Sequence, residues 1–209
     1  MSRITLLFLA MLFSATGFGA EPIVGGPCDL CEAVFVELPQ NLTSKSRIAP
    51  LKEAGEPMLI TGRVLARDGK PRSGVIVYAY HTDAGGIYPK PAKSLGAAAD
   101  RHGRLRGWAI SDTDGRYTFE TIRPASYPSR TIPAHVHMHV IERGCATYYI
   151  DEILFTDDPL LSPVERSPSK EARAGSGVTT PTRDTAGVWK VVRDIQLGSN
   201  IPDYPACGI

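Results

Sequence analysis

The chain has 209 residues, of which 43% are hydrophobic and 22% are charged. Its 23 lysine and arginine residues nearly balance its 22 aspartate and glutamate residues, so the formal net charge is +1. This balance argues against a nucleic-acid partner and against a role at a charged membrane surface. The length suits one domain with a substantial core and short extensions.

Residues 1–20 have the pattern of a secretory signal peptide. Arg3 supplies a positive charge, an apolar run extends from Ile4 to Phe13, and small residues lead to Ala20, after which cleavage is expected. The apolar run is short for a bilayer span, so we expect no stable membrane insertion, with an N-terminal anchor as the alternative. The pattern predicts an exported protein, either periplasmic or extracellular.

The rest of the chain is predicted to be mostly β-structure. Residues 21–57 show no sustained period and are expected to form an extended arm, followed by one domain at 58–200 and a tail at 201–209. Alternating or β-branched runs between turn residues predict strands at 58–65, 75–80, 105–111, 116–122, 135–141, 148–155, 178–182 and 188–197. Short strands at this spacing favour an all-β fold of the β-sandwich type.

Two loops and one helix complete the prediction. Residues 84–103 and 123–134 are interrupted by glycine or proline, so we expect irregular loops that line a pocket. One short helix is expected at 163–174, where Pro163 and Glu165 suit a first turn. The last two predicted strands form a hairpin around Gly187.

The chain contains four cysteines, which are expected to form disulfides after export. They are Cys28, Cys31, Cys145 and Cys207, and the sequence does not choose among the three possible pairings. We favour one bridge that ties down the arm and one that ties Cys207 to the domain. The spacing of Cys28 and Cys31 also fits a redox motif or half of a metal site.

A pair of histidines carries the strongest chemical signal. His135 and His137 are two residues apart in a predicted strand, so both side chains lie on one face, where two imidazoles can bind one metal ion. His139 continues the alternation but lies too far along the strand, so we expect it in a supporting shell or in the core. His81 and His102 are expected at the surface or in loops.

The region around these histidines resembles the intradiol ring-cleavage dioxygenases, particularly the protocatechuate 3,4-dioxygenase type. The resemblance covers about half of the chain, from Gly62 to about Pro159. The matching segments are Val75–Tyr80, Asp83–Tyr88, Leu105–Gly107, Asp114–Phe119, Thr121–Pro124, Tyr127–Pro128 and Pro133–His137. It implies a β-sandwich fold, in agreement with the strand pattern.

The resemblance also implies a site. Tyr88 and Tyr127 would be tyrosinate ligands, and His135 and His137 imidazole ligands, of one Fe(III) per chain. Hard anionic phenolates suit the ferric ion. The partners would be a small aromatic diol and O2, and the product a muconate-type diacid cut between the two hydroxyl-bearing carbons. Tyr127 would leave the iron and accept a proton when the diol binds.

One position departs from the family pattern. Members carry an arginine three residues before the first histidine, where it stabilises the reacting catecholate, and this chain has Ile132 there. Arg130 is predicted to supply that charge as a catalytic residue, with Arg123 as the alternative. A missing cation could cost about 3–4 kcal/mol of transition-state stabilisation.

Two other functions are considered, and the departure at Ile132 supports the first of them. The first is a secreted sandwich that binds iron or an aromatic ligand without efficient turnover. The second is a structural or adhesive sandwich without a metal. The sequence leaves the oligomeric state open, and strand edges and an arm that wraps the domain are compatible with a homodimer.

Overall fold

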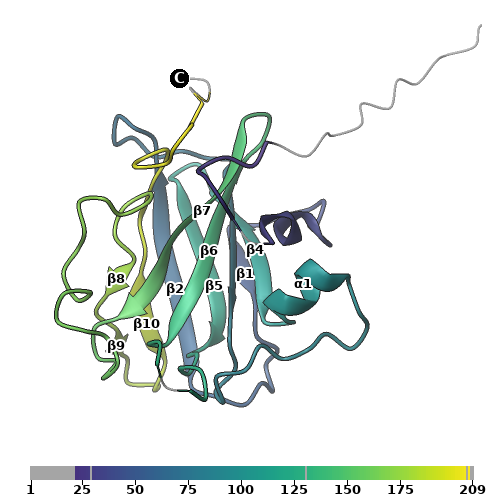
Figure 1. Ribbon diagram of the computed structural model, residues 1–209, viewed down its shortest axis with the longest axis vertical. Coiled ribbons are helices and arrows are strands. Elements are labelled where there is room, and N and C mark those ends of the chain that lie inside the picture. Colours follow the sequence, from purple (N-terminus) through teal and green to yellow (C-terminus); the bar gives the residue numbers. More distant parts are fainter. Residues whose placement is uncertain (1–21, 29, 130, 206, 208–209) are drawn as a thin grey trace, which may run out of the picture.

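A computed structural model of the chain describes residues 22–28, 30–129, 131–205 and 207. Two β-sheets pack face to face as a sandwich (Figure 1). The prediction of an all-β sandwich with at most one or two short helices is therefore confirmed. The predicted signal peptide at 1–20 lies outside the described residues, so export stays a prediction.

The first sheet has five strands and carries the predicted histidine pair. In spatial order they are β4 (Arg106–Ile110), β3 (Ile76–His81), β6 (His135–Glu142), β7 (Ala146–Phe155) and β8 (Val178–Thr179). Neighbouring strands are antiparallel, except that β8 runs parallel to β7. The predicted strands before residue 156 match this sheet and the next to within a few residues.

The second sheet is mixed. Its path is β1 (Lys45–Arg47), β5 (Arg116–Ile122), β2 (Pro57–Leu65), β10 (Trp189–Val192) and β9 (Thr182–Arg183), and β11 (Ile195–Gln196) also pairs with β2. The late hairpin is confirmed as the antiparallel pair β9 and β10. The predicted strand at 178–182 is divided, because residues 178–179 join the other sheet as β8.

Alternation along β6 separates the core from the site. Val136, Met138 and Val140 point between the sheets and are buried in the main core with Ile60 and Phe119. Burying each such side chain contributes about 1.5–3 kcal/mol. The register of β6 is therefore fixed by its apolar residues, and this register directs His135, His137 and His139 to the outer face of the five-stranded sheet.

A second, smaller core covers part of this outer face. The 3-10 helix η1 (Cys31–Phe35) places Val34 against Tyr78 and Ile76 of β3. The indole of Trp108 donates a hydrogen bond of 2.7 Å to the carbonyl of Val34. Helix α1 (Ala97–His102) lies beside η1 on the same side of the molecule (Figure 1). The part of the outer face around β3 is therefore enclosed, which shields polar groups there from water.

The helix predicted at 163–174 is wrong, because this segment consists of turns. Pro168 interrupts it and removes a backbone donor in mid-segment. The short helix is instead α1, inside a segment predicted to be wholly irregular. It begins with three alanines, the best helix formers, and ends at Gly103, whose φ of +72° favours glycine.

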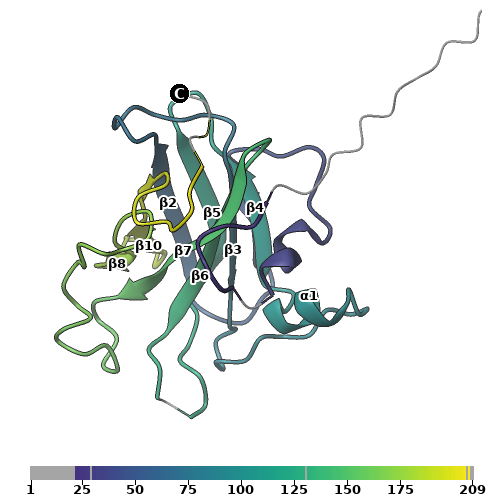
Figure 2. The same ribbon diagram turned by 45° about the horizontal axis from the view of Figure 1, so that its top comes forward.

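The N-terminal arm crosses the outer face of β7 and β6 on its way to η1 (Figure 2). Val24 donates a backbone hydrogen bond to Thr147 of β7, and Thr147 donates one to Pro22. Farther along, the sulfur of Cys28 lies 4.0 Å from Nε2 of His139 on β6. The arm is therefore attached to the sheet that carries the site, and it also contributes β1 to the other sheet.

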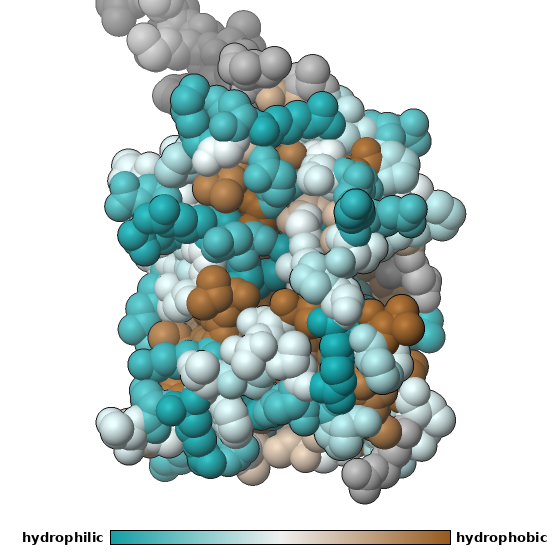
Figure 3. All heavy atoms as spheres, turned by 90° about the vertical axis from the view of Figure 1, so that its left-hand side faces the viewer, coloured by the Kyte–Doolittle hydropathy of each residue, from teal (hydrophilic) through white to brown (hydrophobic). Residues whose placement is uncertain are grey.

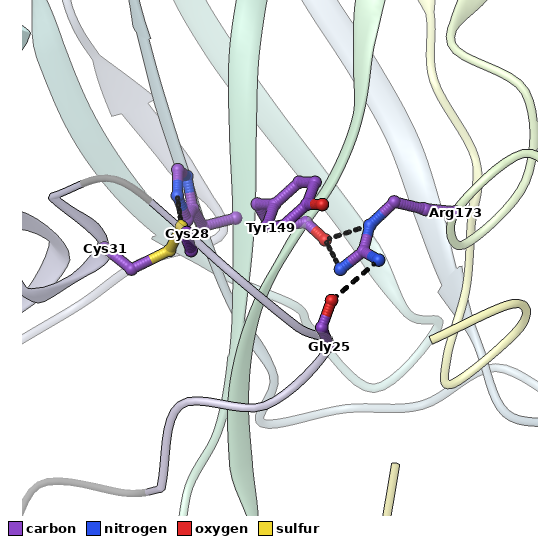
Figure 4. Close-up of a disulfide and its surroundings, with 6 residues drawn as sticks. Gly25, Cys28, Cys31, Tyr149 and Arg173 are labelled. Atoms are coloured by element: carbon purple, nitrogen blue, oxygen red, sulfur yellow. Dashed lines mark hydrogen bonds between the residues drawn. A yellow bond between two sulfur atoms is a disulfide. The ribbon is translucent and has the colours of Figure 1, made fainter. Parts of the chain in front are cut away.

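Both pairs of cysteines form disulfides, Cys28–Cys31 and Cys145–Cys207. The second bridge confirms the expected tie between the tail and the domain. The first bridge joins two cysteines of the arm that are three residues apart (Figure 4). It therefore closes a local loop and does not itself tie the arm to the domain. With its sulfurs in a disulfide, Cys28–Cys31 does not supply thiolates to a metal.

The face in Figure 3 has polar residues interspersed with separate hydrophobic patches. Isolated apolar residues are usual on protein surfaces, so this face gives no specific support for a dimer contact, and the homodimer stays a prediction. The helices among the described residues are too short to cross a bilayer.

Candidate metal centre

The two histidines of β6 lie side by side. Nε2 of His135 is 3.1 Å from Nε2 of His137. The His135 side chain is buried, whereas the His137 side chain is 22% exposed. The strand therefore presents two imidazole nitrogens to one point, as the spacing predicted.

Two tyrosines from separate loops complete the cluster. The hydroxyl of Tyr88 lies 2.8 Å from Nε2 of His137, and that of Tyr127 lies 3.2 Å from Nε2 of His135. The two hydroxyls are 2.9 Å apart. The four atoms form a closed ring in which each is about 3 Å from its neighbours, and we call this ring the four-donor cluster.

Gly86 explains how the two loops come so close. A Cβ atom at this position would lie 1.9 Å from the carbonyl oxygen of Ser126, and the φ of Gly86 is +78°. Only glycine combines this conformation with such a close approach of two backbones. The Tyr88 loop therefore packs directly against the backbone that leads into Tyr127.

Hydrogen bonds on the far side of each imidazole fix its orientation. Nδ1 of His135 lies 2.8 Å from the carbonyl oxygen of Pro133, and Nδ1 of His137 lies 2.7 Å from Oε1 of Glu152. Both contacts favour a hydrogen on Nδ1, so the Nε2 lone pairs face the four-donor cluster. Metal-binding histidines in proteins have this arrangement of a ligating nitrogen and an oriented one.

A β-bulge brings Glu152 to this position. Val136 pairs with Ile153 and Met138 with Ile150, so one residue of β6 lies opposite two of β7. The extra residue shifts the alternation of β7, and Glu152 thereby lies on the outer face beside His137. Sequence reasoning missed Glu152, because an undisturbed strand gives no sign of the bulge.

The protonation states of Tyr88 and His135 are compatible with binding of a cation at the four-donor cluster. Burial raises the pKa of Tyr88 far above its ordinary value, and the adjacent Tyr127 hydroxyl adds to the effect. Burial lowers the pKa of His135, and a positive charge on His137 would lower it further. His135 is therefore neutral near pH 7 and available as a ligand, whereas the Tyr88 phenol ionises only when a nearby positive charge compensates for burial.

The four donors fit a single metal ion. Ligands bound at about 2.0–2.2 Å lie about 3 Å from one another when they are neighbours on the same ion, which is the spacing of the four-donor cluster. Two phenolates and two imidazoles are a hard, anionic set appropriate to a trivalent ion. Nitrogen and oxygen atoms of His135, His137 and Glu152 also lie within 4.8 Å of one another. Because Glu152 contacts Nδ1, we assign it an orienting role.

A cleft of about 410 Å³ borders the cluster at His137. It opens between β6, β7 and the arm, on the side of Glu152, and its lining includes Tyr80, Tyr149 and Val178. None of its described lining residues comes from the loops at 84–103 and 123–134, so the expectation that these loops line the substrate pocket stays a prediction. Those loops instead supply Tyr88 and Tyr127.

The other predicted charges lie elsewhere. Arg123 forms a bidentate pair with Asp157 at 2.6 and 2.9 Å, so its charge is already neutralised by that carboxylate. Ile132 is 44% exposed. Arg130, the predicted catalytic arginine, lies outside the described residues, and its role stays a prediction.

Three histidines outside the cluster are buried. His139 is buried on the outer face of the sheet, where its ring lies against the ring of Tyr78 in the smaller core. The surface positions expected for His81 and His102 are wrong. His81 bonds to Thr121 at 2.6 Å, and His102 lies 2.9 Å from the Tyr78 hydroxyl in the outer core.

Tyr80 is a further residue that the sequence did not single out. Its ring is stacked between the rings of His137 and His102, at centroid distances of 4.5 and 3.8 Å. Tyr80 thereby fixes the plane of the His137 ring from the side that Glu152 does not contact. Its only sequence signal was its place at the end of a buried strand.

Comparison with known proteins agrees with this geometry. The family model described as "Dioxygenase" matches residues 34–174, more than half of the chain. The chain belongs to the intradiol ring-cleavage dioxygenase family, whose members use non-haem iron.

Curated relatives include the protocatechuate 3,4-dioxygenase beta chain of Burkholderia cepacia, 29% identical over 69% of this chain and 58% of the relative. The hydroxyquinol 1,2-dioxygenase of a Rhizobium strain is 30% identical over 68% of this chain and 50% of the relative. The match thus spans little more than half the length of these relatives. An intradiol ring-cleavage dioxygenase from Tetranychus urticae shares the fold, with a TM-score of 0.52 and 18% identity over 85% of this chain and 94% of that chain.

Proposed function

We propose that this protein is an exported intradiol dioxygenase with one Fe(III) per chain, which cleaves a catechol-type ring with O2 to a muconate-type diacid. The observation that carries the proposal is the four-donor cluster, two hydroxyls and two imidazole nitrogens each about 3 Å from its neighbours. The similarity to dioxygenases named for protocatechuate and hydroxyquinol supports a small aromatic diol as substrate. Export rests on the sequence of residues 1–20.

In this proposal Tyr88, Tyr127, His135 and His137 hold the iron. Bound ferric iron would supply Lewis acidity to a chelated diol and draw electron density from its ring. Glu152 and Pro133 keep the two imidazoles in place through their Nδ1 contacts. Tyr88 is half-buried and its hydroxyl contacts both Tyr127 and His137, which suits a ligand that stays bound.

Tyr127 has the role of proton acceptor. Its hydroxyl neighbours Tyr88 and His135 and comes from the loop at 123–134. A diol that binds must lose its hydroxyl protons, and the Tyr127 phenolate oxygen is placed to accept one of them. The proton would then reside on the Tyr127 oxygen, 3.2 Å from Nε2 of His135.

A second candidate function is iron or aromatic-ligand binding without efficient turnover. It is favoured by Ile132 at the position of the family arginine and by the pairing of Arg123 with Asp157. Oxygen uptake with a panel of catechols separates the two candidates. Uptake matched to ring cleavage supports the enzyme, and tight binding without uptake supports the binding protein.

The first experiment is a visible spectrum of the purified protein with iron quantified in the same sample. We expect a broad tyrosinate-to-Fe(III) absorption and about one iron per chain. His135→Ala and His137→Ala should each abolish iron binding, whereas Tyr204→Phe, which removes a phenol far from the site, should leave the band unchanged. Full iron content and turnover in both histidine variants would disprove the assignment.

A further inference from the structure

The disulfide of the arm lies against a histidine of β6. Sγ of Cys28 is 4.0 Å from Nε2 of His139, 111 residues later in the chain. The two sulfurs of Cys28 and Cys31 and one ring nitrogen of His139 all lie within 4.8 Å of one another. The spacing of the cysteines fits half of a metal site, and the fold brings a third donor to this pair, which is shown in Figure 4.

The His139 imidazole lacks an ordinary hydrogen-bond partner. The residue is only 4% exposed, and Nδ1 has no partner within the described part of the chain. Nε2 faces the sulfur of Cys28, which is a weak partner for a ring nitrogen. A buried polar group left in this condition calls for an explanation, such as an ion or a chemical role.

Aromatic rings hold the His139 imidazole in place. The ring centroids of Tyr78, Tyr80 and His102 lie 5.8, 6.1 and 6.2 Å from that of His139. Rings packed at these distances restrict rotation of the imidazole. Nε2 therefore stays directed at the cysteines, as a preorganised ligand would.

The three residues can be reached from the cleft of about 410 Å³. Cys28 and His139 both belong to its lining. Cys28 is half-buried, whereas Cys31 is 1% exposed. A reductant or an ion that enters the cleft therefore meets Cys28 first, and the cleft leaves room for a water molecule beside the three donors.

We propose that Cys28, Cys31 and His139 form a zinc site when the Cys28–Cys31 disulfide is reduced. A dithiol reductant would give two electrons and two protons to the S–S bond, which opens to two thiols while the reductant becomes a disulfide. Zn(II) would then displace both thiol protons and bind the two thiolates and Nε2 of His139, with water from the cleft as the fourth ligand. Two thiolates cancel the charge of the ion, which suits a buried position.

The spacing of the donors is close to what one zinc ion requires. With Zn–S bonds of about 2.3 Å and Zn–N bonds of about 2.0–2.1 Å, a sulfur and a nitrogen on one tetrahedral ion lie about 3.6 Å apart. Sγ of Cys28 and Nε2 of His139 are 4.0 Å apart before any adjustment. Sulfurs two residues removed from each other in one loop are the usual zinc-binding pair.

The two states would fasten the arm differently. The disulfide joins Cys28 only to Cys31, within the arm. A zinc ion would also join both cysteines to His139, and hence the arm to β6. Zinc should therefore raise the midpoint of urea unfolding of the reduced protein and leave that of the oxidised protein unchanged.

The test adds Co(II), and then Zn(II), to the purified protein with any iron it holds left in place. The additions are made before and after reduction by a phosphine, which converts each disulfide to two thiols and takes up oxygen from water. We expect a thiolate-to-Co(II) charge-transfer band only after reduction, because disulfide sulfurs are not thiolates. Zn(II) should displace Co(II) and remove the band. Cobalt at the four-donor cluster has no sulfur ligand and gives no such band.

Two variants assign the ligands. Cys28→Ser/Cys31→Ser retains the thiols of Cys145 and Cys207 after reduction and should lose the band. His139→Gln should weaken zinc binding to the reduced protein by at least about tenfold, since loss of a ligand costs at least as much as loss of a residue that orients one. Competition with a chromophoric chelator measures this value.

His102→Gln is the matched control for His139→Gln. It changes a buried histidine of the same outer core, whose Nδ1 lies 2.9 Å from the Tyr78 hydroxyl, and should alter zinc affinity less than about threefold. If His139→Gln does not fold, NMR of the His139 ring nitrogens in the unmodified reduced protein decides. The Nε2 resonance should shift when zinc is added.

Three results would overturn the inference. They are a reduced protein without the thiolate band, a band that persists in Cys28→Ser/Cys31→Ser, and a His139→Gln variant with unchanged zinc affinity. An Nε2 resonance of His139 that zinc does not move would have the same meaning. The proposed function would be unaffected by any of these results, because the four-donor cluster uses none of these three residues.

Discussion

Oε1 of Glu152 lies 2.7 Å from Nδ1 of His137, on the opposite side of the imidazole from the four-donor cluster. Burial alone would raise the pKa of the Glu152 carboxyl, but the contact with His137 outweighs it and lowers that pKa. The carboxylate is therefore ionised at neutral pH and accepts the Nδ1 hydrogen. A ligand imidazole held by a carboxylate is better oriented and more basic than a free one.

Glu152→Ala should lower the affinity for ferric iron by about 10–100-fold, because His137 loses its orienting partner. Glu152→Gln should lose less of the affinity for ferric iron, since its amide oxygen still accepts a hydrogen bond from Nδ1 of His137. Competition with a chelator measures both values. Asp151→Asn changes the neighbouring carboxylate of the same strand and serves as the control. Wild-type affinity in Glu152→Ala would show that the contact plays no part in metal binding.

The histidine pair could be predicted from the sequence, whereas Glu152 could not. The two-residue spacing of His135 and His137 decides their common face as soon as β6 is recognised as a strand. The face of Glu152 depends on a bulge that shifts β7 by one residue relative to β6. Such a shift results from pairing between strands, and no property of the β7 sequence alone reports it.

The positions of Tyr88 and Tyr127 in the site could not be predicted from local sequence patterns alone. Eight tyrosines occur in the chain, and only the family motif singled out Tyr88 and Tyr127. Their meeting depends on the backbone contact between Gly86 and Ser126, forty residues later in the chain. Likewise His81 was expected at the surface or in a loop, but packing of the two sheets buries it against Thr121 of β5.

Iron loading should release a proton from Tyr88. Burial keeps the pKa of this phenol above its ordinary value, so the phenol is protonated near pH 7 and must lose its proton to bind as tyrosinate. The apparent affinity for ferric iron therefore rises with pH, by about tenfold per pH unit for each proton released. Competition with ferric citrate at several pH values, corrected for the citrate, measures the slope.

Tyr88→Phe should reduce this slope by about one proton and weaken the visible band. Tyr204→Phe, which removes a phenol bonded to Glu142 instead of one in the cluster, is the matched control. An unchanged slope in Tyr88→Phe would mean that Tyr88 does not ionise when the metal binds.

Buried neutral His81 should make the folded protein sensitive to acid. Its ring is fully buried between Thr121 and the carbonyl of Thr82, and burial lowers the pKa of His81 from 6.5 to about 4. The unfolded chain therefore binds more protons than the folded one in this range. The stabilisation of the folded state by neutral, buried His81 is fully present above about pH 6.5 and is lost as the pH falls from there through about 4. His81 alone should account for about 2 kcal/mol of the loss between pH 8 and pH 5.

Urea denaturation of the metal-free protein at several pH values checks this expectation. Between pH 8 and pH 5 the free energy of unfolding of His81→Gln should fall by about 2 kcal/mol less than that of the unmodified protein, whatever the effect of the substitution on stability at pH 8. If this variant is too unstable to measure, titration of the His81 ring by NMR in the unmodified protein gives the pKa directly. A value near 6.5 would contradict the prediction.

The two disulfides should differ in their contribution to stability. Cys145 and Cys207 are 62 residues apart, whereas Cys28 and Cys31 are three apart. The stabilisation by a disulfide grows with the length of the loop that it closes. Replacing Cys145 and Cys207 by serine should therefore lower the free energy of unfolding by about 4 kcal/mol, and replacing Cys28 and Cys31 should lower it by at most about 2 kcal/mol. Urea denaturation without reductant measures both double variants, and each is the control for the other.

Cys145–Cys207 lies near the strands of the metal site, so its removal also tests whether the disulfide affects iron binding. Cys145 lies in the turn between β6 and β7, the strands that carry His135, His137 and Glu152. In the same region Tyr204 of the tail bonds to Glu142 at the end of β6, at 2.9 Å. This bond continues to hold the tail near the turn after the disulfide is removed, so we expect lower stability with iron affinity reduced less than threefold. A collapse of iron affinity in a variant that still folds would show that the bridge itself sets the register of β6 and β7.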